Sequence, residues 1–383
     1  MVKTRTIENT KYFSKKIGTL PKGCKQCVQG KKTVLFITGL CPRSCEYCPV
    51  SDTKMQHDVI YANERPITNS KEFLEESKTC SSQGAGITGG DPLVSLKRTV
   101  EYIKKAKEQN PKYHLHLYTS MNLVTEKTLK QLYDAGLDEI RFHLDLDDDS
   151  LWNKLSLAKN FSWDTGVEIP VIPNKEKQTK KLIDFVEDKV SFLNLNELEL
   201  ADSNANILAK RGFKSKDKVS YAVKGSAELA ERLLNYCLNK KLNVHYCSAK
   251  LKDKIQLVRR IKRRAKNISK EYDMITHDGT LVRGVIYTKH CFPEGNYTKV
   301  LENLKSEERK ELVSQLKRFR LKLLHKYGIP PELIGIDKEK ARLLTTGGVI
   351  EELTQEIKSK GFLPGIIEEF PTWDGFIVDL ALL

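Results

Sequence analysis

The chain has 383 residues, of which 39% are hydrophobic and 30% are charged. This length exceeds that of one ordinary domain, and the composition excludes a disordered chain. No run approaches the roughly 18 apolar residues of a membrane-spanning helix, and the N-terminal residues lack the pattern of a signal peptide. We therefore expect a cytoplasmic protein with no membrane partner.

The chain carries 65 Lys and Arg against 50 Asp and Glu, a formal net charge of +15. Such an excess favours an anionic partner such as nucleic acid, but a Lys-rich and Glu-rich surface is also typical of heat-adapted proteins. The chain also contains nine cysteines. Disulfides would not persist in a reducing compartment, so these cysteines favour metal or redox chemistry.

Residues 1–32 are polar, basic and interrupted by Pro and Gly, and we expect an irregular N-terminal segment there. Strands and helices then alternate. We expect strands at 33–38, 85–88, 114–118, 139–144, 167–172, 191–200 and 242–246, and helices near 70–81, 96–109, 126–135, 150–158, 179–190 and 227–239. This alternation predicts a parallel sheet, either open and doubly wound or closed into a complete or partial barrel. In each case function is expected at the carboxyl ends of the strands.

The pattern changes after residue 250. We expect a basic helix over 251–265, a hairpin over 274–287 with Asp278-Gly279 as its turn, helices over 306–327 and 349–360, and strands near 342–345 and 376–380. The sequence therefore predicts three parts: an N-terminal segment (1–32), a β/α domain (33–250) and a smaller, basic α+β domain (251–383).

The strongest motif directly follows the first expected strand. Cys41, Cys45 and Cys48 have the spacing C-x3-C-x2-C. Three thiolates on one short turn can hold a single [4Fe–4S] cluster, and three ligands leave one of its four irons open. A structural zinc site would need a fourth ligand close by.

This motif, with Tyr47 just before the last cysteine, resembles the signature of the radical S-adenosylmethionine (SAM) superfamily. The resemblance implies an α/β fold with a partial (β/α)6-like barrel, and an enzyme whose open iron binds SAM. Reductive cleavage of SAM would give a 5′-deoxyadenosyl radical that abstracts hydrogen from a substrate. It also implies a reductant protein such as ferredoxin or a flavoprotein, and a contact between adenine and the main chain of Tyr47. The chain looks like archaeal members distantly similar to pyruvate formate-lyase activating enzymes.

The resemblance implies further SAM-binding residues at the ends of strands. Gly89, Gly90 and Asp91 resemble the Gly-Gly-Glu-Pro element that cradles the amino group of SAM, with Asp in place of Glu. Ser120, after the third strand, and Asn174, after the fifth, occupy positions that commonly contact SAM. Both could instead cap the helix that follows.

Four other residues are candidates for chemistry. Cys24 and Cys27 form a C-x2-C pair that could hold half of an auxiliary iron–sulfur or zinc site, or could remain unmetallated. His245 and Cys247 lie two positions apart on the last strand of the β/α domain, so their side chains share one face. They could be catalytic, with Cys247 donating a hydrogen atom to a substrate radical, or they could pack in the core.

The densest run of positive charge contains Arg259, Arg260, Lys262, Arg263 and Arg264. On a helix these side chains would cover more than one face, which suits contact with a phosphate backbone. Our first expectation is therefore a macromolecular substrate, with RNA such as tRNA ahead of protein. The alternatives are glycyl-radical-type activation of a protein, modification of a small metabolite, or a non-catalytic iron–sulfur or zinc protein that binds nucleic acid.

Overall fold

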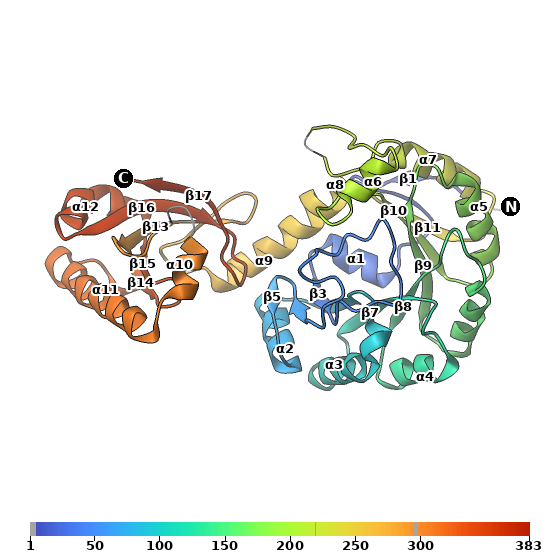
Figure 1. The fold of residues 1–383 in the computed structure, drawn as a ribbon, viewed down its shortest axis with the longest axis horizontal. Coiled ribbons are helices and arrows are strands. Elements are labelled where there is room, and N and C mark those ends of the chain that lie inside the picture. Colours follow the sequence, from blue (N-terminus) through green and yellow to red (C-terminus); the bar gives the residue numbers. More distant parts are fainter. Residues whose placement is uncertain (1–4, 219, 294–296) are drawn as a thin grey trace. The chain divides into compact units, whose positions relative to one another are not determined.

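The computed structural model describes residues 5–218, 220–293 and 297–383 (Figure 1). The chain divides into two units, Met1–Arg260 and Ile261–Leu383. The boundary lies at residue 260 rather than at the expected residue 250. The reason is that Arg259 donates a hydrogen bond to the Val28 carbonyl (2.8 Å) and Arg260 pairs with Glu64, so this stretch belongs to the first unit.

The first unit is built around an open sheet of parallel strands (Figure 1). The seven parallel strands follow one another in chain order: β3 (Lys32–Phe36), β6 (Gly84–Thr88), β7 (His114–Ser120), β8 (Glu139–His143), β9 (Asp164–Val171), β10 (Phe192–Glu197) and β11 (Asn243–Cys247). Each coincides with an expected strand. The partial barrel is therefore confirmed, with one strand more than the (β/α)6 pattern has.

The helices between these strands lie on the outside of the arc (Figure 1). They are α2 (Ser70–Thr79), α3 (Leu96–Gln109), α4 (Glu126–Asp134), α5 (Glu176–Val186) and α7 (Ser226–Cys237). The short α6 (Ala205–Lys210) lies instead beside the segment that follows β3, since Asn204 at its start donates to the Tyr47 carbonyl. Side-chain caps fix two of their starts: Asn69 accepts from the Glu72 N–H, and Thr125 accepts from the Thr128 N–H. The helix expected at 150–158 is instead 3-10 helical, over Trp152–Asn160.

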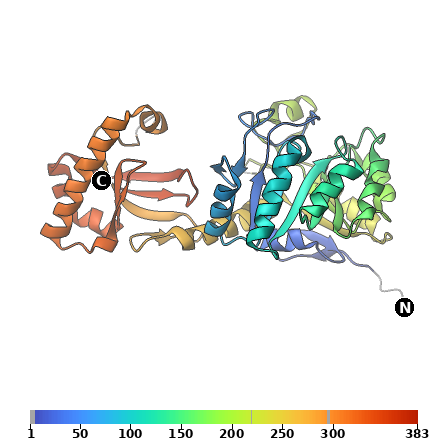
Figure 2. The ribbon, with the colours of Figure 1, turned by 90° about the horizontal axis from the view of Figure 1, so that it is seen from below.

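The described part of the N-terminal segment, residues 5–32, has short regular elements that the expectation of an irregular segment missed. It contains β1 (Glu8–Asn9), β2 (Lys15–Ile17) and α1 (Lys22–Val28). Strand β2 pairs antiparallel with β11 and extends the sheet, while β4 (Tyr61–Ala62) and β5 (Arg65–Pro66) extend its other edge. Helix α1 lies inside the arc, at one end of the strands (Figures 1 and 2). These elements are too short to give a periodic pattern, and α1 is held by contacts with distant strands.

A continuous helical segment follows β11: α8 (Ala249–Leu251), a π-helical stretch (Lys252–Leu257) and α9 (Val258–Ile268). The second unit is an antiparallel sheet in the order β14 (Ile334–Asp337), β15 (Arg342–Thr345), β13 (Leu281–Thr288), β16 (Phe362–Glu369) and β17 (Ile377–Leu382). Strand β12 (Met274–Ile275) forms the expected hairpin with β13, and its turn places Gly279 at φ +91°. The helices are α10 (Tyr297–Asn303), α11 (Ser306–Tyr327) and α12 (Gly347–Ser359). In the part of the chain that the structure describes, no helix has the length and apolar character needed to cross a bilayer.

Candidate active site

The three motif cysteines lie on a segment after β3, residues 39–50, which we call the cysteine loop. It packs on the turn that follows β6. The Gly90 N–H donates to the Thr38 carbonyl (2.7 Å), and the Asp91 N–H donates to the Leu40 carbonyl (2.9 Å). A Cβ atom on Gly90 would lie 2.3 Å from the Leu40 oxygen, so a larger residue would separate the two segments. This turn, residues 89–91, which we call the glycine turn, therefore fixes the position of the cysteine loop.

Residues from two other strand ends also hold the cysteine loop. Arg43 forms an ion pair with Asp145 (2.5 Å) and donates to the His143 carbonyl (3.2 Å). The Tyr47 hydroxyl lies 2.8 Å from Nε2 of His143, and the Tyr47 carbonyl accepts from the Asn204 amide at 3.2 Å. The loop is thus anchored to β8 and to the segment after β10, as well as to the glycine turn.

Cys41, Cys45 and Cys48 are free thiols that line one large cavity inside the barrel. Burial raises the pKa of the Cys41 and Cys45 thiols above the ordinary value. Across the described ranges, no set of three or more Cys, His, Asp or Glu side chains has the spacing of a formed metal site. Three thiols on one anchored loop match the donor chemistry of an iron–sulfur cluster.

Asp91 is buried, at 1% exposure, and its carboxylate accepts four hydrogen bonds from the protein. Oδ1 accepts from the Leu93 N–H (3.0 Å) and the Thr119 hydroxyl (2.8 Å). Oδ2 accepts from the Ser120 N–H (3.0 Å) and the Ser120 hydroxyl (2.6 Å). Asp91 and Ser120, both predicted to contact SAM, thus contact each other and join the end of β7 to the glycine turn.

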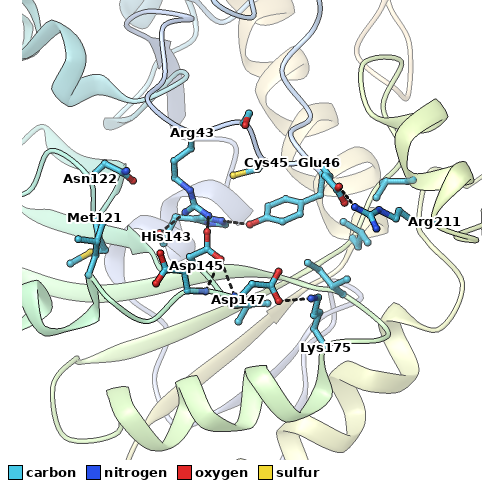
Figure 3. Close-up of a pocket in the computed structure, with 18 of the residues that line it drawn as sticks. Arg43, Cys45, Glu46, Met121, Asn122, His143, Asp145, Asp147, Lys175 and Arg211 are labelled. Carbon is cyan, nitrogen blue, oxygen red and sulfur yellow. Dashed lines mark hydrogen bonds and ion pairs between the residues drawn. The ribbon is translucent and has the colours of Figure 1, made fainter.

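A cavity of about 510 Å³ adjoins the cysteine loop (Figure 3). Its wall combines acidic, basic, polar and apolar residues, including Arg43, Tyr47, Met121, His143, Asp145, Asp147, Asp148, Trp152, Asn174, Lys175 and Arg211. Carboxylates suit the hydroxyls of a ribose, and apolar walls suit a purine ring. Asn174 is therefore placed where an adenosine group could bind, whereas Ser120 lines the larger cavity.

The larger cavity, which we call the chamber, fills the inside of the barrel with a volume of about 930 Å³. It extends from the cysteine loop at the carboxyl ends of the strands to Cys24 and Cys27 of α1. Polar side chains from five neighbouring strands form much of its wall: His116, Tyr118, Arg141, His143, Glu168, Asn194, Asn196, His245 and Cys247. They occupy alternate positions because only every second side chain of a strand points inward.

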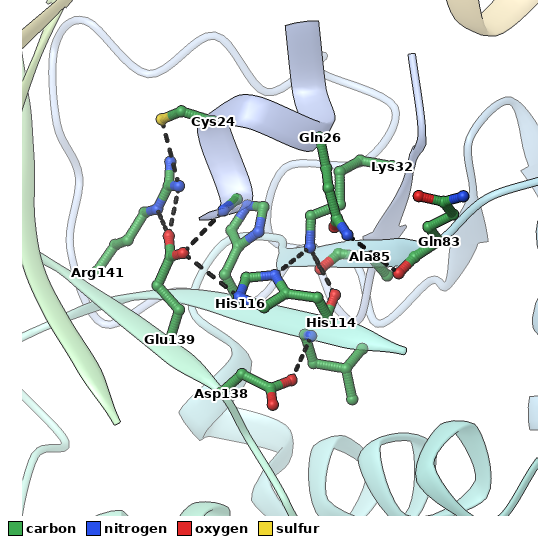
Figure 4. A network of polar contacts seen from close by, with 12 residues as sticks. Cys24, Gln26, Lys32, Gln83, Ala85, His114, His116, Asp138, Glu139 and Arg141 are labelled. Atoms are coloured by element: carbon green, nitrogen blue, oxygen red, sulfur yellow. Dashed lines mark hydrogen bonds and ion pairs between the residues drawn. The ribbon is translucent and has the colours of Figure 1, made fainter. Parts of the chain in front are cut away.

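Helix α1 closes the chamber at the amino ends of the strands (Figure 4). The Cys24 sulfur accepts hydrogen bonds from the Asn194 amide (3.3 Å) and the Arg141 guanidinium (3.5 Å). Burial raises the pKa of Cys24 to about 12 and also raises that of Cys27. The C-x2-C pair thus lies at the opposite end of the chamber from the cysteine loop, and its role as an auxiliary metal site stays a prediction.

Arg141 is the buried charge at the centre of the chamber wall. It pairs with Glu139 at 2.5 Å and with Glu168 at 2.7 Å. Glu168 also accepts hydrogen bonds from the amides of Asn194 and Asn196, both at 2.8 Å. Burial by itself would raise the pKa of Glu168, but Arg141 and the two amides hold it below its ordinary value. This network keeps Glu168 ionised and fixes the two amides.

Lys32 lies at the floor of the chamber beside the same network (Figure 4). Its Nζ donates to the Ala85 carbonyl (3.0 Å) and lies 2.9 Å from Nδ1 of His114. Burial lowers the pKa of Lys32 to about 7, against the opposing effect of Cys27 and Glu139. Burial therefore brings the pKa of this lysine close to neutral pH.

His245 is 2% exposed, and no described residue forms a hydrogen bond with either of its ring nitrogens. Burial lowers the pKa of His245 to about 4, so the ring is neutral at pH 7. Burial also raises the pKa of the Cys247 thiol, whose sulfur lies 3.9 Å from the Gln256 amide. Both side chains line the chamber, as their shared face predicts. Their catalytic role stays a prediction.

The basic run does not present five free cations. Arg260 is 8% exposed and is paired with Glu64; Arg264 is 7% exposed and donates to the Pro371 carbonyl. Burial withdraws both guanidinium groups from solvent and so argues against the predicted nucleic-acid contact of these two arginines, which stays a prediction. The other three residues of the run have intermediate exposure: Arg259, Lys262 and Arg263.

Sequence reasoning missed the chamber wall, in particular Arg141, Glu168 and Asn194. The inside of a parallel barrel is ordinarily filled by Val, Ile and Leu. Here polar residues recur at alternate positions of successive strands, as in Glu139-x-Arg141-x-His143. That alternation could have revealed the cavity. The outer face of such a strand packs on helices, so polar residues at the alternate positions must point inward, and a barrel accommodates them only where it is hollow.

The Radical SAM superfamily model matches residues 35–186, a range that contains the cysteine loop, the glycine turn and β6 to β9. An open parallel barrel with three free cysteines after its first strand is what this superfamily requires. The chain belongs to the radical SAM superfamily. It is accordingly an enzyme that uses a [4Fe–4S] cluster and SAM and needs a reductant.

Within that class, the chain is similar to activating enzymes. A Methanocaldococcus jannaschii protein, MJ0021, named provisionally as a glycyl-radical enzyme activating enzyme, is 46% identical over 288 residues, which cover 73% of this chain and 76% of that protein. The biotin synthase of Thioalkalivibrio sulfidiphilus is 32% identical over 120 residues, or 30% of this chain and 33% of that protein. Among solved structures, coproporphyrinogen III oxidase (HemN) from Escherichia coli aligns with a TM-score of 0.37 and 11% identity, over 88% of this chain and 92% of that one.

Proposed function

We propose that this chain activates a partner protein by abstracting a hydrogen atom from one of its glycine residues. The observation that carries this proposal is the 46% identity to MJ0021 over about three quarters of both chains. The chamber supports it, because a cavity of about 930 Å³ that begins at the cysteine loop is large enough for the tip of a polypeptide loop.

We infer that Cys41, Cys45 and Cys48 hold the cluster and that the main chain of Gly89 and Gly90 receives the amino group of SAM. The cluster and SAM, when bound, supply the radical that removes the hydrogen atom. The cysteine loop contributes a fixed position, because three strand ends anchor it. The surrounding barrel excludes water from the reacting atoms.

For the other predicted residues we propose supporting roles. Tyr47 and Asn174 line the cavity of about 510 Å³, where the adenosine group of SAM would bind. Asp91 positions Ser120 and the glycine turn, because its carboxylate is fully used within the protein. For Cys247 we propose that it lines the chamber and does not donate a hydrogen atom to the substrate radical, since in activation the radical remains on the partner protein.

The test traces which molecule the abstracted hydrogen atom comes from, so the partner protein does not have to be known. The source organism is grown on glycine deuterated at its α-carbon, and a protein extract is prepared from these cells. The extract is incubated under anaerobic conditions with the reconstituted chain, SAM and a reductant. We expect deuterium in the 5′-deoxyadenosine product, measured by mass spectrometry. The Cys45→Ala variant, a loop-matched control that lacks the middle thiol of the motif, should produce no 5′-deoxyadenosine.

Two treatments of the extract separate the substrate classes. Protease should abolish the transfer of deuterium, whereas ribonuclease should leave it unchanged. Loss on ribonuclease treatment would restore RNA as the substrate. Transfer that survives both treatments and passes through a small-molecule filter would instead indicate a metabolite.

A further inference from the structure

We propose that Asn194 and His245 form an amide-binding site in the chamber wall, which holds the uncharged main chain of the segment presented for hydrogen abstraction. This inference rests on the proposed function and specifies how the substrate is recognised. Its basis is a pair of buried side chains with unused hydrogen-bonding atoms, side by side on neighbouring strands of a cavity wall.

Asn194 has a fixed orientation with one free acceptor. It is 2% exposed, and its amide nitrogen donates to Glu168 (2.8 Å) and to the Cys24 sulfur (3.3 Å). Because both N–H donors are used, the amide cannot flip without losing these bonds. Its Oδ1 atom is buried and has no hydrogen-bond partner among the described residues. Burying an acceptor without a partner is costly, so a donor on a ligand would complete this site.

His245 supplies the complementary group. In the register of β10 and β11 it is the direct partner of Asn194, and neighbouring strands lie roughly 4.8 Å apart. A neutral imidazole has one N–H donor and one acceptor nitrogen, and both nitrogens of His245 are unused by the described protein. His116, on β7, adds a fourth buried atom of this kind, its Nδ1. The wall thus offers an acceptor beside a donor.

The charges of the chamber favour a neutral ligand. Its cationic lining residues already contact acceptors: Lys32 contacts Ala85 and His114, Arg43 pairs with Asp145, Arg141 pairs with Glu139 and Glu168, and Lys252 pairs with Glu199. Among the described residues that line the chamber, no cation is left without an acceptor to neutralise a carboxylate or phosphate beside Asn194. A peptide group, by contrast, carries an N–H for Asn194 and a C=O for His245. A glycine residue has no side chain, so its recognition must use such main-chain groups.

The experiment measures binding to the full chain by an NMR titration, independently of catalysis. The probe is the neutral tripeptide amide acetyl-Gly-Gly-Gly-NH2, compared with the same peptide ending in a free carboxylate. We expect the amide to bind at least tenfold more tightly. Asn194→Leu and His245→Phe should each weaken its binding roughly 3–10-fold, the loss of one hydrogen bond. His245→Gln, which keeps a donor and an acceptor, should bind within about twofold of the parent chain, as should Asn235→Leu on the exposed face of α7, the matched control.

Equal affinity for the two peptides, or unchanged binding by both Asn194→Leu and His245→Phe, would overturn the site. Thermal unfolding of each variant establishes that a loss of affinity does not come from a loss of fold. The deuterium experiment separates the two proposals. Transfer from glycine without any effect of these variants removes the amide site and leaves the function, whereas amide binding without transfer removes the function and leaves the site.

Discussion

Asp91 has two possible roles that can be tested against each other. The sequence motif predicts that it contacts SAM, whereas in the structure its carboxylate joins the end of β7 to the glycine turn. If its carboxylate anchors the end of β7 to the glycine turn, Asp91→Asn will destabilise the protein in the absence of any cofactor. If it binds SAM instead, the same change will leave the free protein unaltered and will raise only the dissociation constant of SAM. The two outcomes are distinguishable in one series of measurements.

The expected magnitude follows from the four hydrogen bonds of Asp91. An asparagine keeps the oxygen that accepts from Leu93 and Thr119, but it places an NH2 group against the Ser120 N–H and hydroxyl. Hydrogen bonds to a charged group contribute about 1.5–3 kcal/mol each, so losing the one from the Ser120 N–H and weakening the others should cost about 2–4 kcal/mol. For a unit of this size each kcal/mol lowers the Tm by roughly 2–4 °C.

The assay is thermal unfolding of the cofactor-free protein, followed by circular dichroism and calorimetry. Asp91→Glu, the residue more frequent in the family motif, is the control for retained charge, and it should be less destabilised than Asp91→Asn. A change of unfolding free energy below about 0.5 kcal/mol for Asp91→Asn, the range of a neutral surface substitution, would refute the anchoring role.

Three further predictions concern buried contacts of the first unit. Gly23→Ala should destabilise the protein despite the better helix propensity of Ala, because its Cβ would lie 2.5 Å from a buried Nη of Arg141; a higher Tm would contradict this. The Lys32 pKa of about 7 lies below the ordinary value, so the unfolded chain binds more protons between pH 7 and 8.5 and stability should rise with pH there, by up to about 1.4 kcal/mol per unit. Denaturant titrations should show that Lys32→Met lacks this slope. Arg260→Met should lower the Tm through loss of the Glu64 pair, yet leave any RNA gel shift unchanged; a tenfold weaker shift would oppose the buried assignment.

The seven parallel strands could be predicted from the sequence, because each strand is a local apolar run between helices with regular periodicity. Their order could not be predicted from that alternation, which also allows a doubly wound sheet; the partial barrel followed from the family resemblance. The cysteine loop and the glycine turn could be predicted because their spacing is set by local chemistry. The N-terminal elements could not. Helix α1 has seven residues, and its contacts with β8 and β10, through Cys24 and Gly23, span more than a hundred positions of the chain.

The basic run shows a second limit of the sequence. Its five cations are adjacent in the chain, but a helix turns them toward different surroundings, and two of the five become buried. Charge density along a sequence indicates how much positive charge is present, not which side chains reach solvent. Arg260 pairs with Glu64, which lies nearly 200 positions earlier in the chain, and the local sequence pattern does not predict that pair.

The chamber itself connects stability with function. A barrel filled with Val, Ile and Leu would be more stable than one lined by a buried arginine, two carboxylates and neutral histidines, since burying such groups carries a desolvation cost that ion pairing offsets only in part. Arg141 and Glu168 are satisfied within the network, whereas Oδ1 of Asn194 and the ring nitrogens of His245 have no hydrogen-bond partner in the part of the chain that the structure describes. The network holds the neighbouring unsatisfied groups in a fixed orientation. A preorganised binding site needs this, because the side chains are ordered before the ligand binds and their ordering does not reduce the affinity. The polar wall is therefore better explained by a substrate that enters the barrel than by the folding of the barrel alone.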